Sequence, residues 1–356
     1  METLATDMKI TRVEKSRIGD FDPENIVFGS MFTDHMLVAD CVNGEWQTPE
    51  IVPFGEIGFN PALASLHYGQ SIFEGMKAFK NEAGEVLMFR PLENFKRFNI
   101  SAERMCMVQV PEEIYMGGLN ELLKLDAAWV PSGEDNSLYL RPFMFASDVY
   151  LGVRPSLNYR FMIIMSPAGQ YYSTPPKVKV ETEFIRAAPG GVGYAKCAGN
   201  YAASLYPAKK AQEQGYTQLL WTDALTHTKF EESGTMNVFF VKDGVLMTPK
   251  TSTTILKGIT RDSLLQIAKS MDIVVSEEDI YVKDIIEGIS DGSVTEVFGA
   301  GTAVVVSPFA AIAFDGKDYN LPAITEDSVS SKLKAALNAI RTEQVEDTFG
   351  WVWKVK

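Results

Sequence analysis

The sequence has few residues of the kinds that cross-link a chain or hold a metal ion. Its 356 residues include three cysteines and three histidines. The cysteines, Cys41, Cys106 and Cys197, are odd in number, and no two of them have the spacing of a metal or redox motif. The histidines are also far apart. We therefore expect no metal site, no disulfide framework and a reducing, cytoplasmic environment.

Long apolar runs and excess positive charge are also lacking. No stretch approaches the roughly 20 apolar residues that a membrane helix needs, and residues 1–15 have no apolar core typical of a secretory signal. Acidic side chains outnumber basic ones, 46 to 33, which gives a formal net charge of −13. This charge argues against nucleic acid or a membrane surface as a partner, but a local basic cluster can still bind a small anion.

What the chain does have is the composition of a globular protein, with 46% hydrophobic residues and a length that suits two domains. The patterns predict a smaller α+β domain over residues 1–167 and a linker over 168–176. A larger, mostly β domain with flanking helices is expected over residues 177–356.

Periodicity and turn residues predict the individual elements. Pro91 suits the first turn of a helix and Thr260 suits an N-cap, while Asn43-Gly44 and Asp243-Gly244 predict turns between strands. Helices are expected over residues 91–105, 111–130, 200–215, 260–271 and 330–344. Strands or hairpins are expected over residues 35–46, 78–90, 137–147, 159–167, 178–189, 217–223, 237–249 and 295–308.

Lys196 stands among small residues in the stretch GYAKCAGNYAASL, residues 193–205. Most lysines are solvated at the surface. A lysine that forms a Schiff base must instead be neutral, which requires a dry pocket. Small neighbours leave room for a flat ring against the backbone, so the stretch is compatible with either interpretation.

Two glycine-rich turns are candidate anion sites. KGITRDS, residues 257–263, leads into a helix whose first N–H groups suit a phosphate, and Gly258 permits a close approach. FGAGTA, residues 298–303, offers Thr302 but lacks the context of a dinucleotide fingerprint. A bulge in a buried strand explains this second turn equally well, and each turn alone is a weak signal.

Two glutamates precede the apolar strand in FEESGTMNVFF, residues 230–240. A carboxylate at the edge of a buried strand needs a cationic partner, such as a lysine, an arginine or a protonated ligand nitrogen. For Glu231 we favour a solvated turn, which leaves Glu232 as the candidate for such a partner.

Two arginines receive different interpretations. In LYLRPF, residues 138–143, Arg141 shares a strand face with Tyr139 and needs an anionic partner, which is either structural or a substrate carboxylate. Arg97 is one of several charges on a predicted helix and, by itself, is interpreted as a surface residue. The coincidence of a lysine among small residues, a strand-edge carboxylate and two glycine-rich turns suggests a phosphorylated aldehyde cofactor.

Seven motifs extend this suggestion along nearly the whole chain. They are LHYGQSIFEGMKAF (66–79), FRPLENFKRF (89–98), LYLRPF (138–143), GGVGYAKCAGNYAASL (190–205), FEESGTMNVFF (230–240), ILKGITRDSLL (255–265) and EVFGAGTAVVV (296–306). In this order they resemble the branched-chain amino acid aminotransferases of pyridoxal-phosphate fold type IV. The resemblance implies a two-domain α/β (α+β) fold with pyridoxal 5′-phosphate at the domain interface, and a homodimer.

The resemblance also implies roles for the residues at matching positions. Lys196 would be the Schiff-base lysine and the base that moves the proton. The other cofactor contacts would be Arg97 at the phosphate, Glu232 at the pyridine nitrogen, Tyr201 at the phenolic oxygen, and Gly258, Ile259, Thr260 and Thr302 around the phosphate. The substrate would contact Phe28, Tyr68, Phe73, Tyr139, Arg141, Val153, Tyr171, Thr235, Met236 and Ala303, with Val153 reaching the pocket of the partner subunit.

The reaction implied is transamination between L-leucine, L-isoleucine or L-valine and 2-oxoglutarate. D-amino acid aminotransferases and aminodeoxychorismate lyase share the fold, and a non-catalytic cofactor-binding protein is a further alternative. The LHY, LYLRP and TMN motifs favour the branched-chain enzyme. Val304 and Ser307 replace the cysteine pair of the vertebrate enzymes, so we expect no thiol redox switch of that kind.

Overall fold

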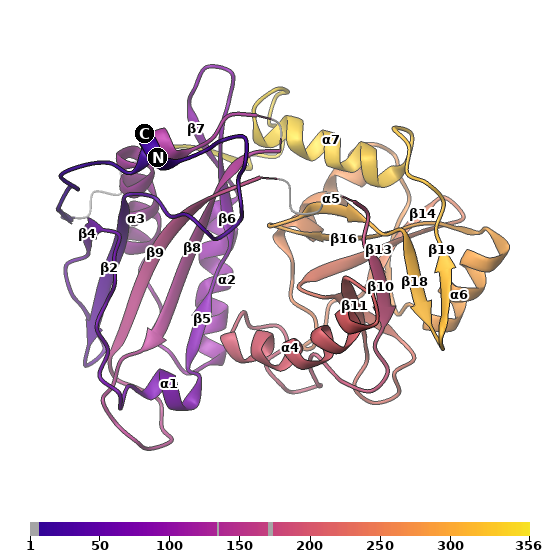
Figure 1. The fold of residues 1–356 in the computed structure, drawn as a ribbon, viewed down its shortest axis with the longest axis horizontal. Coiled ribbons are helices and arrows are strands. Elements are labelled where there is room, and N and C mark those ends of the chain that lie inside the picture. The colour runs from indigo at the N-terminus through magenta and orange to yellow at the C-terminus, as the bar shows by residue number, and fades with distance from the viewer. Residues whose placement is uncertain (1–6, 134, 170–173) are drawn as a thin grey trace. The chain divides into compact units, whose positions relative to one another are not determined.

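The computed structural model describes residues 7–133, 135–169 and 174–356, which form two compact units (Figure 1). Unit 1 comprises Met1–Tyr171, Ala195–Gly199 and Ala339–Lys356, and unit 2 comprises Tyr172–Tyr194 and Asn200–Asn338. The chain therefore returns to unit 1 twice after first leaving it. The predicted linker, 168–176, includes four residues that lie outside the described ranges, and the domain division at that linker stays a prediction.

Unit 1 is built on a sheet with the strand order β1-β4-β2-β9-β8-β6-β7-β20, in which β3 also pairs with β2 and β5 with β8. The long antiparallel pair β8–β9 runs from Ser137 opposite Ala168 to Ala146 opposite Tyr159. The strands are β1 Lys9–Ile10, β2 His35–Val42, β3 Glu45–Trp46, β4 Glu50–Pro53, β5 Ser71–Phe73, β6 Met76–Lys80, β7 Val86–Phe89, β8 Ser137–Ala146, β9 Tyr159–Ala168 and β20 Val352–Lys354.

The helices of unit 1 pack on this sheet through aromatic rings. Phe98 of α2 and Tyr115 of α3 both contact Phe161 of β9, with ring centroids 5.4 and 5.6 Å away. All three side chains are fully buried, and burial of large aromatic surfaces is a major source of stability. The helices are α1 Ala64–Tyr68, α2 Pro91–Arg104 and α3 Glu112–Leu125, with short 3₁₀ turns at Ile18–Asp20 and Ala127–Trp129.

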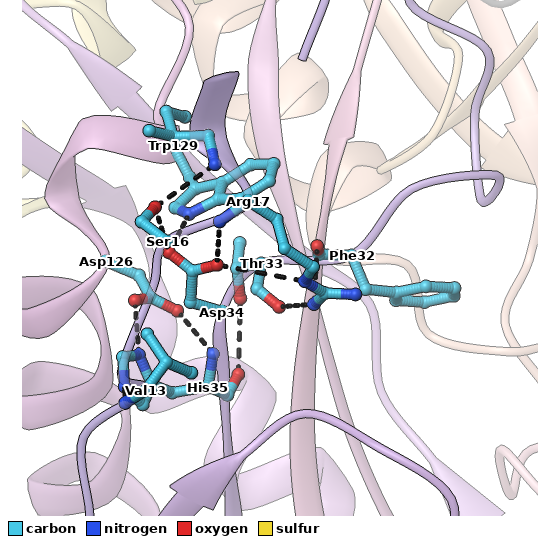
Figure 2. Close-up of polar contacts among 10 residues, drawn as sticks. Val13, Ser16, Arg17, Phe32, Thr33, Asp34, His35, Asp126 and Trp129 are labelled. Carbon is cyan, nitrogen blue, oxygen red and sulfur yellow. Dashed lines mark hydrogen bonds and ion pairs between the residues drawn. The ribbon is translucent and has the colours of Figure 1, made fainter. Parts of the chain in front are cut away.

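A buried polar network ties the segment before β2 to unit 1, as Figure 2 shows. Asp34 accepts hydrogen bonds from the Ser16 hydroxyl, the Arg17 N–H and the Trp129 indole. His35 contacts Asp126 through Nδ1 at 2.7 Å, and its Nε2 accepts the N–H of Val13. Because Nε2 is an acceptor, the proton of this histidine lies on Nδ1 and is donated to Asp126.

Unit 2 is built on a second sheet with the order β15-β14-β13-β12-β11-β10-β18-β19, in which β16 pairs with β13 and β17. Its strands are β10 Lys177–Val180, β11 Gln218–Thr222, β12 Phe230–Ser233, β13 Met236–Lys242, β14 Val245–Pro249, β15 Val275–Glu278, β16 Val294–Gly301, β17 Val305–Pro308, β18 Ala311–Phe314 and β19 Lys317–Asn320. The remaining helices are α4 Ala198–Glu213, α5 Ile259–Ser270, α6 Val282–Asp291 and α7 Val329–Arg341. None of the described helices is both long and apolar enough to cross a bilayer.

The predicted fold class is confirmed, as are both turns between strands. Asn43 and Gly44 have φ values of 52° and 84°, and Asp243 and Gly244 have values of 49° and 76°. Positive φ at both central residues is the requirement of a tight two-residue turn between antiparallel strands. Pro91 occupies the first turn of α2, as its position predicted.

Four predicted boundaries are wrong. The strand predicted over 178–189 ends at Val180, because the Glu181 carboxylate accepts the N–H groups of Glu183 and Phe184 and turns the chain. Helix α3 ends at Leu125 rather than residue 130. The N-cap of α5 is Gly258 rather than Thr260. The run over 295–308, expected as a strand interrupted at Gly299 and Gly301, is interrupted after Gly301 but continues through Gly299.

Candidate active site

Lys196 lies in a short segment of unit 1 that is held from two sides. The N–H of Phe73 donates to the Lys196 carbonyl at 3.0 Å, and the N–H of Lys196 donates to the Ser101 hydroxyl at 2.9 Å. Ala195 and Cys197 are almost fully buried, whereas Lys196 is half-buried. Small residues are needed here because the backbone itself packs against β5 and α2. The Lys196 amine lies 4.7 Å from the centroid of the Phe73 ring.

A buried ion pair stands near this lysine. Arg97 donates to Glu74 through Nε at 2.7 Å and through Nη2 at 2.8 Å, and Asn94 donates to the same carboxylate at 2.7 Å. Burial alone would raise the pKa of Glu74, but the charge and hydrogen bonds of Arg97, with a contribution from the charge of Lys196, hold that pKa below its usual value. Arg97 is 9% exposed, so its interpretation as a surface residue is wrong.

Among the described residues, Arg141 is held by aromatic rings rather than by a carboxylate. Its Nη2 donates to the Tyr139 hydroxyl at 3.0 Å, and its guanidinium lies 4.6 Å from the Phe73 centroid and 5.2 Å from that of Tyr139. The shared face of Arg141 and Tyr139 is therefore confirmed. Phe28 meets Tyr139 edge to face at 5.0 Å. Within the described residues no acceptor reaches Nε of Arg141, which leaves this cation suited to an anionic ligand.

Unit 2 holds a second buried ion pair, between Glu232 and Arg186. Arg186 Nε lies 2.6 Å from Glu232 Oε2, and its Nη2 donates to the carbonyls of Gly193 and Thr254. The other carboxylate oxygen accepts the N–H of Leu256 at 2.9 Å. Glu232 is 3% exposed, so the predicted need of this glutamate for a cationic partner is met by Arg186, a residue that the sequence did not single out.

Asn237 joins Glu232 to the start of α5. Its Nδ2 donates to Glu232 Oε1 at 3.2 Å and to the Leu256 carbonyl at 2.9 Å. A Cβ atom at Gly258 would lie 1.9 Å from Asn237 Oδ1, so this position accepts only glycine without a rearrangement. No side chain caps the first N–H groups of α5 among the described residues. An uncapped helix N-terminus is suited to an anion such as phosphate.

The structure brings only some of the predicted residues together. Phe73, Arg141, Tyr139 and Phe28 form one cluster in unit 1, with Lys196 over the Phe73 ring. The others lie on several elements. In unit 1, Tyr68 ends α1 and is exposed, and Val153 is 88% exposed. In unit 2, Tyr201 on α4 is half-buried, Thr235 is exposed and Met236 is buried at the β12–β13 turn, Thr302 and Ala303 are half-buried after β16, and Ile259 and Thr260 begin α5. Tyr171 lies outside the described residues.

Sequence reasoning missed the residues that support these groups. Glu74 had a detectable signal, because it is a carboxylate within the apolar run SIFEGMKAF, the same pattern that drew attention to Arg141. Arg186 had a similar signal, because it follows Phe184 and Ile185 within the strand predicted over 178–189, but it lies outside all seven motifs. The remaining supports, Asn94, Ser101 and Asn237, are ordinary polar residues; the contacts of Asn94 and Ser101 are distant in sequence, whereas Glu232 lies only five residues before Asn237.

Comparison with known proteins gives consistent matches. The family described as "Amino-transferase class IV" matches residues 71–312. "Branched-chain-amino-acid aminotransferase 2" of Bacillus subtilis (strain 168) is 39% identical over 99% of this chain and 97% of its own length. The solved branched-chain amino acid aminotransferase of Escherichia coli is 27% identical, with a TM-score of 0.74 over 91% of this chain and 99% of that chain. The solved T.th. branched-chain amino acid aminotransferase, complexed with N-(5′-phosphopyridoxyl)-L-glutamate, is 26% identical, with a TM-score of 0.73 over 89% of this chain and 98% of that chain.

Proposed function

The chain belongs to the class IV amino-transferase family, and we propose that it is a branched-chain amino acid aminotransferase. In this proposal it moves the amino group of L-leucine, L-isoleucine or L-valine to 2-oxoglutarate with pyridoxal 5′-phosphate as the cofactor. The curated relatives carry the activity class in their names. The bound phosphopyridoxyl-glutamate of the T.th. enzyme supports both the cofactor and glutamate as one of the two amino acids.

One observation carries the proposal: Asn237 contacts both a buried carboxylate and the uncapped start of α5. A carboxylate is the group that stabilises a protonated pyridine nitrogen, and a helix N-terminus is suited to a phosphate. Pyridoxal phosphate carries these two groups on one ring, so the donor and acceptor chemistry of unit 2 fits this cofactor. When bound, the cofactor supplies an electron sink that acidifies the Cα–H bond of the amino acid.

The chain's own residues would divide the remaining work. Lys196 would bond to the cofactor aldehyde and move the proton between the substrate Cα and the cofactor. Its main chain is fixed by the hydrogen bonds to Phe73 and Ser101. The proposed cofactor contacts are Arg97, Gly258, Ile259, Thr260 and Thr302 at the phosphate, Tyr201 at the phenolic oxygen and Glu232 at the ring nitrogen.

With Arg141, the proposed substrate pocket would accept both an apolar side chain and a carboxylate. The aromatic side chains of Phe28, Phe73 and Tyr139 suit an aliphatic amino acid side chain. The guanidinium of Arg141 in contact with two of these rings suits the second carboxylate of glutamate or 2-oxoglutarate. The other proposed substrate contacts are Tyr68, Val153, Tyr171, Thr235, Met236 and Ala303.

A homodimer is part of the proposal. Residues 149–153 expose consecutive apolar side chains, with Val149 at 58%, Leu151 at 65% and Val153 at 88%. A contiguous exposed apolar patch is typical of a protein interface, and sedimentation velocity with the variant Val153→Asp tests this, because a dimer that uses the patch should weaken. We also propose a cytoplasmic location, which fractionation of the native cells tests.

The central test combines activity with absorbance. We expect turnover of L-leucine with 2-oxoglutarate and a visible to near-ultraviolet band from the lysine-bound cofactor. Lys196→Ala should abolish both, whereas Lys209→Ala, on the exposed surface of α4, should leave both unchanged. Turnover of D-amino acids alone, or release of pyruvate from aminodeoxychorismate without transamination, would replace the proposed reaction. An unchanged band in Lys196→Ala would overturn the role of this lysine.

A further inference from the structure

Unit 2 contains a cavity of about 270 Å³ to which Glu231 contributes. Glu231 and Glu232 are adjacent on β12, so their side chains leave opposite faces of the strand. Glu232 contacts Arg186, while Glu231 contacts Thr254 and lines the cavity. The lining residues are Pro189, Asp223, Ala224, Leu225, Lys229, Phe230, Glu231, Pro249, Lys250, Ser252, Thr253, Thr254, Ile255 and Asp279.

Glu231 is not the solvated turn residue that the sequence suggested. It is 8% exposed and lies within β12. Its Oε1 accepts the Thr254 hydroxyl at 2.5 Å, but no donor from the described residues reaches its buried Oε2. Burial raises the pKa of Glu231, against smaller opposite effects of the Thr254 hydrogen bond and the charge of Arg186. An unsatisfied buried acceptor is costly and therefore uncommon in native structures.

Three other buried carboxylates among the described residues, Asp34, Asp126 and Glu296, have donors at both oxygens. Both oxygens of Asp34 and both oxygens of Asp126 have donors (Figure 2). The two oxygens of Glu296 accept the N–H groups of Val329 and Ser330. Glu231 therefore differs from the carboxylates that serve only to hold the fold together.

Three of the other four charges that line the cavity, Asp223, Lys229 and Asp279, are engaged in contacts with the protein. Burial opposes the ionisation of Asp223, but the N–H groups of Lys229, Thr226 and Thr228 and the Thr226 hydroxyl outweigh it and lower its pKa to about 2. The Lys229 amine lies 2.6 Å from the Asp279 carboxylate. Lys250 is exposed. The lining has three carboxylates and two lysines, and Glu231 is the buried acid with an unused oxygen.

We propose that this cavity is a second binding site, for a small organic cation whose N–H group donates to the Glu231 carboxylate. Because Oε2 is buried, the Glu231 side chain must turn toward the cavity for this contact to form. The class comprises guanidinium and primary ammonium compounds, because they combine positive charge with N–H donors. The hydroxyls of Ser252 and Thr253 add polar contacts. The volume is near the lower limit of small-molecule pockets, about 300 Å³, so the ligand must be small.

The proposed site is connected to the candidate active site by one chain of contacts. Thr254 donates its hydroxyl to Glu231 and accepts Nη2 of Arg186 through its carbonyl. Arg186 in turn pairs with Glu232. An occupant that neutralises Glu231 therefore acts on the arginine that holds Glu232. Binding itself does not depend on the proposed transaminase activity, and its test uses no turnover.

The test is a titration with methylguanidinium, followed by saturation-transfer difference NMR of its methyl signal on the holoenzyme. Methylguanidinium carries N–H donors and does not form a Schiff base with the cofactor aldehyde. Tetramethylammonium, which has the same charge but no N–H, is the matched probe. We expect saturable binding of methylguanidinium with a dissociation constant on the order of 1 mM, and binding of tetramethylammonium at least about tenfold weaker.

Two variants locate the binding. Glu231→Gln removes the charge with little change of shape and should weaken methylguanidinium about tenfold or more, while the exposed Glu213→Gln should leave it unchanged. Leu225→Arg, at a position 81% exposed, places a cation beside the cavity and should weaken binding even if Glu231→Gln fails to fold. No saturable binding, equal binding of both probes, or unchanged binding in Leu225→Arg would overturn the proposal.

Discussion

Each unit contains one buried glutamate–arginine pair, and the two pairs are built alike. In unit 1, Asn94 donates both to Glu74 and to the carbonyl of Gly75. In unit 2, Asn237 donates both to Glu232 and to the carbonyl of Leu256. The pairs differ in which member is fixed by its surroundings. Glu74 is fully enclosed and gives both oxygens to Arg97, whereas Arg186 uses its second nitrogen to hold two carbonyls.

This difference indicates which member of each pair supports the other. A group whose hydrogen-bonding capacity goes to the protein fixes its partner, and the partner contacts the ligand. If Arg97 binds the phosphate and Glu232 the ring nitrogen, as proposed, Glu74 would orient Arg97 for an anion and Arg186 would orient Glu232 for a cation. The same two residue types would then serve opposite functions in the two units.

The largest expected effect is loss of stability when the support in unit 1 is removed. Glu74→Gln leaves Arg97 buried without its counter-charge, and breaking a buried pair in this way costs about 3–5 kcal/mol. Urea unfolding measures the change, with Glu93→Gln, on the exposed surface of α2, as the control expected to lie within about 0.5 kcal/mol of the parent. A Glu74→Gln variant as stable as this control would show that Glu74 does not have a supporting role.

The next effect is on turnover, in unit 2. Glu232→Gln removes the carboxylate proposed for the ring nitrogen, and loss of one preorganised electrostatic contact lowers kcat by about 10²–10³. Glu232→Asp keeps the charge and should retain more activity. Steady-state kinetics at saturating cofactor measures both. A parental kcat in Glu232→Gln, together with a loss of kcat in folded Glu74→Gln, would contradict the proposed roles of the two glutamates.

Arg97→Lys should weaken cofactor binding about tenfold. Lysine keeps the charge but cannot form the bidentate contact with Glu74 that orients the side chain. Fluorescence titration of the cofactor-free protein measures the dissociation constant. Arg104→Lys, at the end of the same helix, is the control. Equal affinities for the two variants would remove Arg97 from the phosphate site.

The smallest expected effect is on the pH dependence of the free energy of unfolding, to which Glu74 and Glu231 contribute with opposite signs. Because the folded-state pKa of Glu74 is lowered, its stabilisation is present above about pH 4.5 and is lost as the pH falls through the folded-state pKa. The folded-state pKa of Glu231 is raised, so its ionisation costs stability as the pH rises above about 4.5.

Glu231→Gln should therefore stabilise the protein more at pH 7 than at pH 4, measured by urea unfolding at both values. The other charged groups around Glu231 are present in both proteins, so they contribute to the pH dependence of each. They are Asp223, Lys229, Lys250, Asp279 and Arg186. Equal effects at the two pH values would show that Glu231 does not titrate with a raised pKa.

Much of the fold was predictable because its signals are local. Strand alternation placed Arg141 beside Tyr139, and Asn-Gly and Asp-Gly turns marked their hairpins. The seven motifs led to the family and to the residues proposed for the site. The supports were not predictable, because Arg186 and Ser101 act through partners about 50 to 100 residues away. Glu231 was misjudged because sequence gives no measure of how deeply a turn-flanking residue is buried.

The return of the chain to unit 1 has a consequence for protein synthesis. Strand β20, Val352–Lys354, pairs with β7 and follows Tyr171 by about 180 residues in the chain. At about 5–20 residues per second, residues up to Tyr171 emerge roughly ten to forty seconds before this strand does. During that interval the β7 side of the first sheet lacks its final strand, and the nascent chain exposes unpaired backbone groups there. Pulse-labelled synthesis should find unit 1 sensitive to proteases until β20 has emerged.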